Sequence, residues 1–521
     1  EADRIGTVAG LLDLLARQDR GGAAHEVEAG IDTLGDRHLQ REGIGGKLIF
    51  LTIADPFLIV FTYTGTDTVV MDSREITPNA VQVFEPGSLI KSPKFSPVYY
   101  NDVIHNISGD GDELKLIFNI ENLGYSFKKG KIGLHDLNFT TSSKNLVGIM
   151  GNSGAGKTTL LNLLNGSVKP SKGKILINGQ EIYSNKKQLR GLIGNIPQDD
   201  LLIEELSVFQ NLFYSSKLFF GGLTDEEITA KVNICLESLK LLEIKDLLVG
   251  DPLNKYISGG QRKRLNIALE LIREPDILFV DEPTSGLSSN DAENVMDLLK
   301  QLTSTGKLIF VVIHQPSSEI FKLFDQLLIL DTGGYPVYFG NPVDSLSYFR
   351  KQMSFVDFEY SECPECGNIN PEEIFRIMES KTVDEFGRAT TQRKINSADW
   401  YRLYNENFVK AKTNNSLAGE AKRQNVIVSN PLIQFLVYFQ RNFFSKVNNK
   451  QYMAITLIEG PLLAFILALA LRSHEVGKEY LFGSNPNIPV YMFICTIVSL
   501  FLGLITSAEE IIQDKKILKR E

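Results

Sequence analysis

The stretch GNSGAGKT at residues 151–158 decides the fold, because it fits the pattern G-x-x-x-x-G-K-[ST]. The apolar run LVGIM precedes it and TLLNLL follows it, an order that predicts a strand, a glycine loop and a helix. The backbone N–H groups of such a loop surround phosphates, the lysine contacts the terminal phosphates, and the hydroxyl ligates Mg²⁺. We therefore predict an α/β P-loop domain with Thr158 as a metal ligand. The predicted nucleotide contacts are Gly151, Asn152, Ser153, Gly154, Ala155, Gly156, Lys157, Thr158 and Thr159.

Two acids end a second apolar run, ILFVDEP at residues 277–283. Four apolar residues in succession predict a buried parallel strand, and ligands of open α/β sheets lie at the carboxyl ends of such strands. We expect Asp281 to hold Mg²⁺ through water and Glu282 to polarise the water that attacks the phosphate. For either acid alone, a purely structural role at the end of a strand is the alternative.

Two more polar residues follow apolar stretches. Gln198 lies in IPQDD, where we expect it to ligate the metal and to sense the terminal phosphate of the nucleotide. His314 follows the apolar run LIFVVI, and we expect it to contact the γ-phosphate. A structural hydrogen bond is the alternative for a lone histidine at the end of a strand. With Glu282, these residues form the predicted catalytic set.

The stretch ISGGQRKR at residues 257–264 presents a second candidate anion site. A Ser-Gly-Gly turn at the start of a helix directs backbone N–H groups and the positive end of the helix dipole toward one anion. The chain therefore carries two phosphate-binding motifs, and the second needs an explanation of its own.

Residues 113–350 resemble the nucleotide-binding domain of an ATP-binding cassette (ABC) protein, and ISGGQRKR resembles the signature sequence of that superfamily. The resemblance implies a P-loop domain with a helical signature subdomain that binds ATP and Mg²⁺. It also implies that two such domains face each other. Ser258, Gly259, Gly260 and Gln261 of one chain would then contact the ATP held by the P-loop of the other, so that one chain carries two half-sites.

The same resemblance implies an aromatic side chain, upstream of the glycine loop, that stacks on adenine. Phe127 fits that place in the stretch GYSF, and Tyr125 is the alternative. Both rings could instead belong to the core of a strand.

A narrower resemblance is to the White-type, or G, subfamily of ABC transporters. It rests on the runs PQDD (197–200), SGGQRKR (258–264), DEPTSGL (281–287), HQPSS (314–318) and NPE (370–372). One position departs from the family pattern: Ser288 stands where an aspartate usually follows Ser-Gly-Leu. That loop passes between the two sites of the dimer in the family, so we expect communication between the sites or the hydrolysis rate to differ.

The composition bounds the remaining function classes. The 521 residues carry a net charge of −9, which argues against nonspecific binding to nucleic acid. Four cysteines fit a reducing compartment better than a disulfide scaffold. Cys363 and Cys366 form a single C-x-x-C, and structural zinc needs four ligands, so we interpret the pair as free thiols in a turn.

Two apolar runs near the C-terminus, residues 453–471 and 488–507, predict membrane spans, because roughly 20 residues at about 1.5 Å each cross a bilayer. Lysines precede the first run and a basic segment follows the second, which places both outer flanks in the cytoplasm by the positive-inside rule. Residues 472–487 are then external. Two buried helices of a soluble core are the alternative.

Glu459 interrupts the first run. A carboxylate within a membrane usually faces protein or water, so Glu459 is a candidate for the transport pathway or for a helix contact. A tolerated acid at the membrane interface is the alternative.

Residues 431–450 alternate apolar and polar side chains at helical spacing and predict an amphipathic helix at the membrane surface. White-type transporters have a connecting helix at this place. Residues 507–521 resemble the start of their coupling region. We interpret residues 351–430 as a linker and residues 451–521 as part of a transmembrane domain.

The N-terminal part is less informative. Residues 44–112 alternate short apolar runs with turns and predict a small all-β domain, for which a regulatory role is a hypothesis. Residues 1–43 lack Lys, Asn, Ser, Phe and Tyr, so we interpret them as an unrelated leader. Two spans cannot enclose a translocation path, and we interpret the chain as a fragment of a longer transporter.

The sequence thus predicts the ATP-hydrolysing subunit of a White-type transporter: an exporter in the plasma or inner membrane that acts as a homodimer with its nucleotide-binding domain in the cytoplasm. The cargo is unknown. The alternative is a membrane-anchored regulatory switch that binds ATP without moving a substrate. A soluble cassette ATPase acting on ribosomes or DNA is disfavoured by the apolar spans and the acidic charge.

Overall fold

A computed structural model describes residues 46–99, 103, 116–353, 369–409, 430–471 and 486–520, apart from gaps at 55–56, 72–73, 85–88, 93, 129, 186–190, 252–255, 385 and 387. The chain divides into two compact units. The first comprises Glu1–Asn195 and Asp276–Arg423, and the second comprises Ile196–Pro275 and Gln424–Glu521. The predicted leader, the Cys363 and Cys366 pair, and most of the predicted external loop lie outside the described residues.

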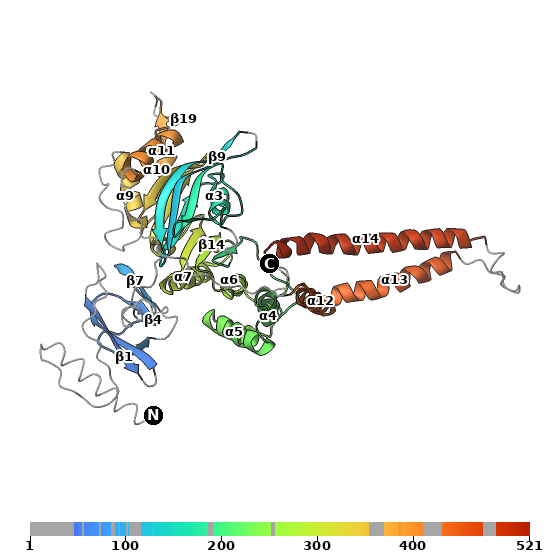
Figure 1. The fold of residues 1–521 in the computed structure, drawn as a ribbon. Helices are drawn as coiled ribbons and strands as arrows, with labels where there is room; N and C mark the ends of the chain where they lie inside the picture. The colour runs from blue at the N-terminus through green and yellow to red at the C-terminus, as the bar shows by residue number, and fades with distance from the viewer. Residues whose placement is uncertain are drawn as a thin grey trace. The chain divides into compact units, whose positions relative to one another are not determined.

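A six-stranded sheet, which contains the strand labelled β14 in Figure 1, carries the glycine loop. Its strand order is β13-β14-β15-β10-β16-β17. The strand β10 (Leu146–Gly151) is buried along its whole length and lies between two parallel neighbours, as expected for a strand covered on both faces. The other strands are β13 (Ile193–Ile196), β14 (Ile277–Asp281), β15 (Leu308–Val312), β16 (Gln326–Asp331) and β17 (Tyr335–Gly340). The strands β16 and β17 pair antiparallel, whereas β14 runs parallel to β15.

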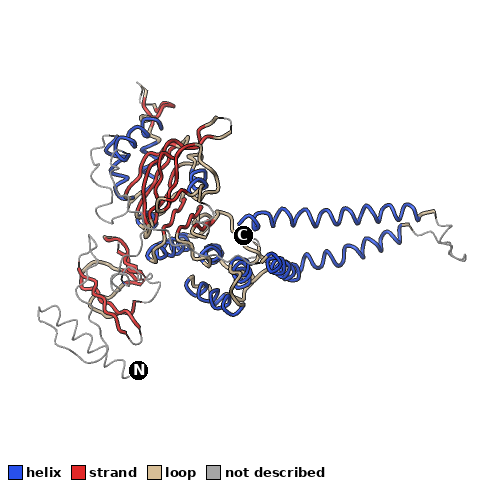
Figure 2. The backbone as a smooth tube through the Cα atoms, viewed as in Figure 1, coloured by secondary structure: helices blue, strands red, loops and turns tan. Residues whose placement is uncertain are grey.

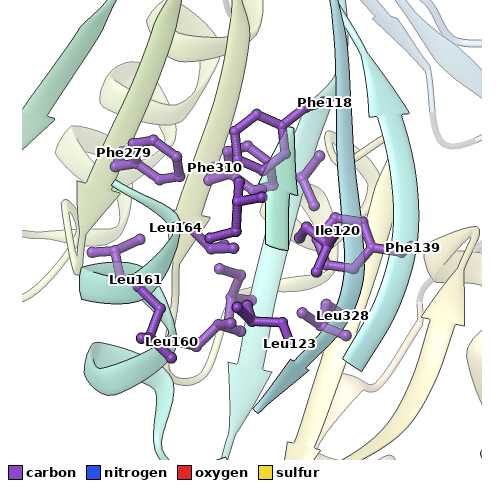
Figure 3. Packing of buried hydrophobic residues seen from close by; sticks show 14 of the residues in the cluster. Phe118, Ile120, Leu123, Phe139, Leu160, Leu161, Leu164, Phe279, Phe310 and Leu328 are labelled. Atoms are coloured by element: carbon purple, nitrogen blue, oxygen red, sulfur yellow. The ribbon is translucent and has the colours of Figure 1, made fainter. Parts of the chain in front are cut away.

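A second, antiparallel sheet has the order β12-β11-β8-β9. Its strands are β8 (Ile117–Ser126), β9 (Ile132–Ser142), β11 (Lys172–Ile177) and β12 (Gln180–Glu181). One hydrophobic core joins both sheets to α3 (Lys157–Leu164), the helix that follows the glycine loop. Figure 3 shows Leu160, Leu161 and Leu164 of α3 in the same cluster as Phe118 and Phe310 of the strands. This packing anchors the loop between two rigid elements.

Helices and a hairpin complete the first unit. They are α7 (Ser289–Ser304), α8 (Ser318–Lys322), α9 (Pro342–Gln352), α10 (Pro371–Met378), β18 (Lys381–Val383), β19 (Ala389–Arg393), α11 (Ser397–Tyr404) and the π-helix η2 (Asn405–Val409). The interpretation of residues 351–430 as a linker missed ordered structure. Trp400 and Tyr404 are fully buried, and the Tyr404 hydroxyl donates to the carbonyl of Asn138 in β9 at 2.9 Å. Residues 369–409 therefore pack onto the nucleotide-binding fold.

The N-terminal strands form two small antiparallel sheets, β1-β2-β5 and β4-β3-β6-β7. Their buried side chains, including Phe61, Tyr63 and Phe84, make a separate cluster. The strands are β1 (Gly46–Ala54), β2 (Phe57–Gly65), β3 (Val70–Met71), β4 (Arg74–Glu75), β5 (Gln82–Phe84), β6 (Leu89–Ser92) and β7 (Phe95–Tyr99).

Helices are the main regular elements of the second unit in the part that the structure describes. Its cassette portion contains α4 (Val208–Phe219), α5 (Asp225–Ser238), the 3₁₀-helix η1 (Leu242–Ile244) and α6 (Gly259–Leu271). The helix α12 (Pro431–Asn448) packs on α4, with Val437 in one cluster with Leu206, Tyr214 and Leu218. Most of the other apolar side chains of α12, such as Phe435, Phe439 and Phe443, are exposed.

Two long helices end the second unit, α13 (Lys450–Ala470) and α14 (Ile488–Arg520), and Figure 2 shows them as a pair. By length and composition, one helix in the described part of the chain could cross a membrane, over Tyr452–Ala470. The apolar part of α14, Ile488–Leu504, is shorter. The helix α14 continues beyond the predicted span through residues 507–520, which contain no Gly or Pro.

Candidate nucleotide-binding site

The glycine loop connects β10 to α3 in a conformation that suits an anion. Gly154 and Gly156 have φ values of +77° and +93°, in the left-handed region that favours glycine. A Cβ atom on Gly151 would lie 2.5 Å from the carbonyl oxygen of Leu330, so any larger residue would displace the neighbouring strand. No side chain caps α3 at Gly156, and the first N–H groups of a helix have no partner within it. The loop therefore fits phosphate groups.

Lys157 is the buried cation of this loop. Its side chain is 7% exposed, and its ammonium group donates to the carbonyl oxygens of Gly151 at 2.7 Å and Asn152 at 3.2 Å. Burial lowers the pKa of Lys157, whereas the carboxylates of Glu282 and Asp281 act to raise it. The lysine thus lies within electrostatic reach of both acids that the sequence analysis selected.

The two acids and His314 lie at the ends of neighbouring strands. Asp281 ends β14 opposite Val312 of β15, and the N–H of Glu282 donates to the Val312 carbonyl at 3.0 Å. Glu282 has a φ of +45°, an uncommon backbone conformation for a residue with a side chain. His314 follows β15 by two residues and is exposed. Because β15 also pairs with β10, these residues share the sheet edge from which the glycine loop starts.

Among the described residues, no three His, Cys, Asp or Glu side chains gather so that they could hold a metal ion alone. A Mg²⁺ ion at this edge would depend on other oxygen donors. The exposed hydroxyl of Thr158, phosphate oxygens and water are of the type that Mg²⁺ prefers. The donor set therefore fits Mg²⁺ bound together with a nucleotide.

Phe127 and Tyr125 occupy different environments, although they share one strand and the turn after it. Tyr125 packs against the hydrophobic core, whereas Phe127 is 43% exposed. A Cβ atom on Gly133 would lie 2.6 Å from the Phe127 ring, and the carbonyl of Gly133 would lie 3.0 Å from a Cβ atom on Gly156. The exposed Phe127 ring is therefore close to the glycine loop.

The signature motif begins α6 in the second unit. The Ser258 hydroxyl accepts from the N–H of Gln261 at 3.2 Å, and the Gln261 side chain accepts from the N–H of Ser258 at 2.7 Å. This capping box does not involve the N–H groups of Gly259 and Gly260. The motif therefore forms a capped helix start with two glycine N–H groups beside the cap.

The basic residues of the same motif hold the segment that contains Gln198. The Lys263 ammonium donates to the Gln198 carbonyl and lies 3.1 Å from a carboxylate oxygen of Asp200. The Arg262 guanidinium lies 3.6 Å from Asp200 and 3.7 Å from Glu204. Both cations are 6% exposed. This role of Arg262 and Lys263 was not predicted, although the acids that follow Gln198 in the sequence could have indicated a nearby pair of cations.

Ser288, the departure from the family pattern, caps α7. Its hydroxyl accepts from the N–H of Asp291 at 3.2 Å and donates to the Asp291 carboxylate at 2.9 Å. Serine is among the preferred N-cap residues, so the replacement is compatible with the helix start. The glycine loop itself makes a contact that no sequence pattern predicted: the side-chain amide of Asn152 donates to the Glu379 carboxylate at 2.6 Å.

Comparisons with known proteins agree with this geometry. The family model described as "ABC transporter" matches residues 134–285. The chain is 40% identical over 235 residues to the ABC-type transporter claG of Penicillium crustosum, covering 44% of this chain and 31% of that protein. It is 40% identical over 273 residues to ABC transporter G family member 13 of Arabidopsis thaliana, and the alignment covers 51% of this chain and 38% of that protein. It is 29% identical over 378 residues to protein white of Drosophila melanogaster, and the alignment covers 68% of this chain and 52% of that protein.

The chain spans about a third to a half of the length of these relatives. The match covers the strand, glycine loop, signature helix and acidic strand end described above. Residues 134–285 therefore form an ABC transporter domain, which is an ATP-binding ATPase domain, and the relatives that the chain resembles include G-family ABC transporters and protein white.

Proposed function

We propose that this chain is the ATP-hydrolysing subunit of a White-type half-transporter, an exporter that acts as a homodimer in the plasma or inner membrane. ATP binding joins two nucleotide-binding domains in the cytoplasm, hydrolysis separates them, and α12 and the C-terminal helices transmit that motion to the membrane. The observation that carries the proposal is the clustering of Lys157, Asp281 and Glu282 at one sheet edge.

The residues at that edge have distinct roles in the proposed hydrolysis. The glycine loop and Lys157 bind the phosphates, and Phe127 stacks on adenine. Glu282 accepts a proton from the attacking water, and His314 contacts the γ-phosphate. Thr158, Gln198 and Asp281 are the proposed metal ligands, and bound Mg²⁺ would neutralise charge that develops on the phosphates.

The proposed homodimer follows from the two half-sites. The capping box at the start of α6 is formed by Ser258 and Gln261, and it does not use the N–H groups of the two glycines between them. Such a helix start stabilises negative charge. In the proposed dimer, Ser258, Gly259, Gly260 and Gln261 contact the nucleotide bound by the partner subunit.

Membrane insertion is proposed from the helices of the second unit. The apolar helix Tyr452–Ala470 has the length of a span, and the exposed phenylalanines of α12 suit the membrane surface. Between them, basic side chains at Lys446 and Lys450 would lie on the cytoplasmic side.

The test is ATP turnover by the chain in lipid discs or micelles, measured across a range of protein concentrations beside the Glu282→Gln variant. Turnover per chain should rise with concentration, because a complete site needs two chains. The variant should lose about 10² to 10⁴-fold, as expected for removal of a general base. Turnover that is independent of concentration, or that survives in the variant, would contradict the proposal. Glu226→Ala, which removes an exposed acid from α5, is the matched control.

A further inference from the structure

The strongest unassigned feature is a chain of polar contacts that starts at the glycine loop and leaves the ATP-binding motifs. It contains Asn152 of the loop, Glu379 at the end of α10, Arg393 of β19 and Asp331 of β16. All four belong to the first unit. Two of them lie in residues 369–409, the segment after the cassette that the family model does not match.

The first contact is made by the loop itself. The side-chain amide of Asn152 donates to a carboxylate oxygen of Glu379 at 2.6 Å. Meanwhile, the main-chain carbonyl of Asn152 accepts from the Lys157 ammonium at 3.2 Å and from the N–H of Ala155 at 3.1 Å. Asn152 therefore connects Glu379 directly to the lysine that the phosphates require. The P-loop motif accepts any residue at this position, so the motif does not account for the contact.

The second contact fixes Glu379 from the other side. The Arg393 guanidinium lies 3.6 Å from Glu379 and donates to both carboxylate oxygens of Asp331, at 3.0 and 2.9 Å. Asp331 is fully buried. A buried carboxylate is costly without a partner, so Arg393 is held firmly in place. The hairpin β18–β19 thereby gains a rigid connection to the sheet.

The contacts form a closed path around the base of the loop. Asp331 follows Leu330, which is opposite Gly151 in the pairing of β16 with β10. Arg393 is thus connected to the glycine loop in two ways. One connection runs through Asp331 and the pairing of β16 with β10, and the other runs through Glu379 and Asn152. A shift of the hairpin would move Asn152 against Gly151, across the turn that holds Lys157.

We infer that Glu379 is a positioning residue for the glycine loop, held by Arg393, and that the segment after the cassette thereby tunes the affinity of the P-loop for ATP. The inference rests on ATP binding by this domain and not on transport. Glu379 acts through Asn152 rather than on the nucleotide. Its side chain is 54% exposed, so its replacement should leave the fold intact.

The experiment measures binding of a fluorescent ATP analogue, together with KM and kcat for ATP, on the full chain in micelles. Glu379→Ala and Asn152→Ala should each weaken ATP binding about three- to tenfold, which is less than the full effect of losing a hydrogen bond to a charged group because the Glu379 side chain is 54% exposed. In Glu379→Ala, KM should rise by a larger factor than kcat falls. Glu379→Gln retains an acceptor for Asn152 and should restore most of the affinity.

A double-mutant cycle separates positioning from a general structural effect. The variant with both alanines should bind ATP about as weakly as either single variant, because both remove the same contact. Glu372→Ala removes another exposed acid from α10 and should bind ATP like the parent chain. The inference is overturned if Glu379→Ala binds ATP normally, if Glu379→Gln is as weak as Glu379→Ala, or if the two alanine effects multiply.

Discussion

Glu205 holds the end of α12 to the cassette portion of the second unit, and its replacement by alanine should release that end. One carboxylate oxygen accepts from the Ser445 hydroxyl at 3.0 Å and the other accepts from the Asn449 amide at 3.1 Å. The Asn448 amide donates to the main-chain carbonyl of Glu205 at 2.9 Å, a bond that alanine preserves. Two of the three contacts are therefore lost.

The structure allows the size of the effect to be worked out. A hydrogen bond to a charged group contributes about 1.5–3 kcal/mol when buried. Because Glu205 is only half-buried, about 1–1.5 kcal/mol for each bond is appropriate. The sum of about 2–3 kcal/mol corresponds to a roughly 30- to 160-fold increase in local opening of the α12 end.

Hydrogen exchange followed by mass spectrometry on the full chain in micelles measures this opening. Peptides that cover residues 441–452 should exchange faster in Glu205→Ala by that factor, while peptides from α5 should not change. Glu226→Ala, at an exposed position of α5, is the control for loss of one acid. Unchanged exchange over residues 441–452, or an equal increase throughout α4 and α5, would refute the reasoning.

Three other predictions concern the core, the adenine contact and a buried thiol. Phe310 is fully buried, with ring centroids 5.0 Å from Phe279 and 5.2 Å from Phe118, so Phe310→Ala should lower the free energy of unfolding by about 3–5 kcal/mol in urea titrations; a loss under about 1 kcal/mol would be inconsistent with this core. Phe127→Ala should weaken ATP binding by roughly fivefold or more while Phe127→Trp retains it, and equal binding by all three proteins would exclude stacking. Burial raises the pKa of the Cys235 thiol from 9.0 to about 12, and the residue is half-buried. In a variant with the other cysteines replaced by serine, iodoacetamide at pH 8 should therefore modify it much more slowly in the folded chain than after denaturation. The folded state loses stability as the pH rises from about 9 toward 12, because over that range the thiol ionises in the unfolded chain and stays protonated in the folded chain. Rapid labelling of the folded chain would contradict the shielding of Cys235.

The P-loop fold could be predicted because its evidence is local. The strand, the glycine loop and the start of the helix lie within one short stretch, and each element has a pattern that depends on neighbouring residues. The evidence for the acidic end of β14 likewise lies within one short stretch, residues 277–283. The placement of Glu282 and His314 at one sheet edge needed only the rule that carboxyl ends of parallel strands meet.

Contacts between distant parts of the chain could not be predicted in this way. Asn152 and Glu379 are 227 residues apart, and Glu205 and Asn449 are 244 apart. Neither pair follows a spacing rule, because each depends on how separate elements pack. Phe127 and Tyr125 have similar neighbours in sequence, and only the turn after β8 makes one exposed and the other part of the core. Sequence alone therefore left that choice open.

The uninterrupted course of α14 has a mechanical consequence. Beyond Leu504, the last residue of its apolar part, the helix continues to Arg520 without a break. These residues extend the rod by about 24 Å, at about 1.5 Å per residue. If the apolar part tilts by about 10°, the far end moves sideways by about 4 Å, roughly the width of one side chain. A small rotation at one end of this lever thus becomes a displacement at the other that is large enough to make or break a packed contact.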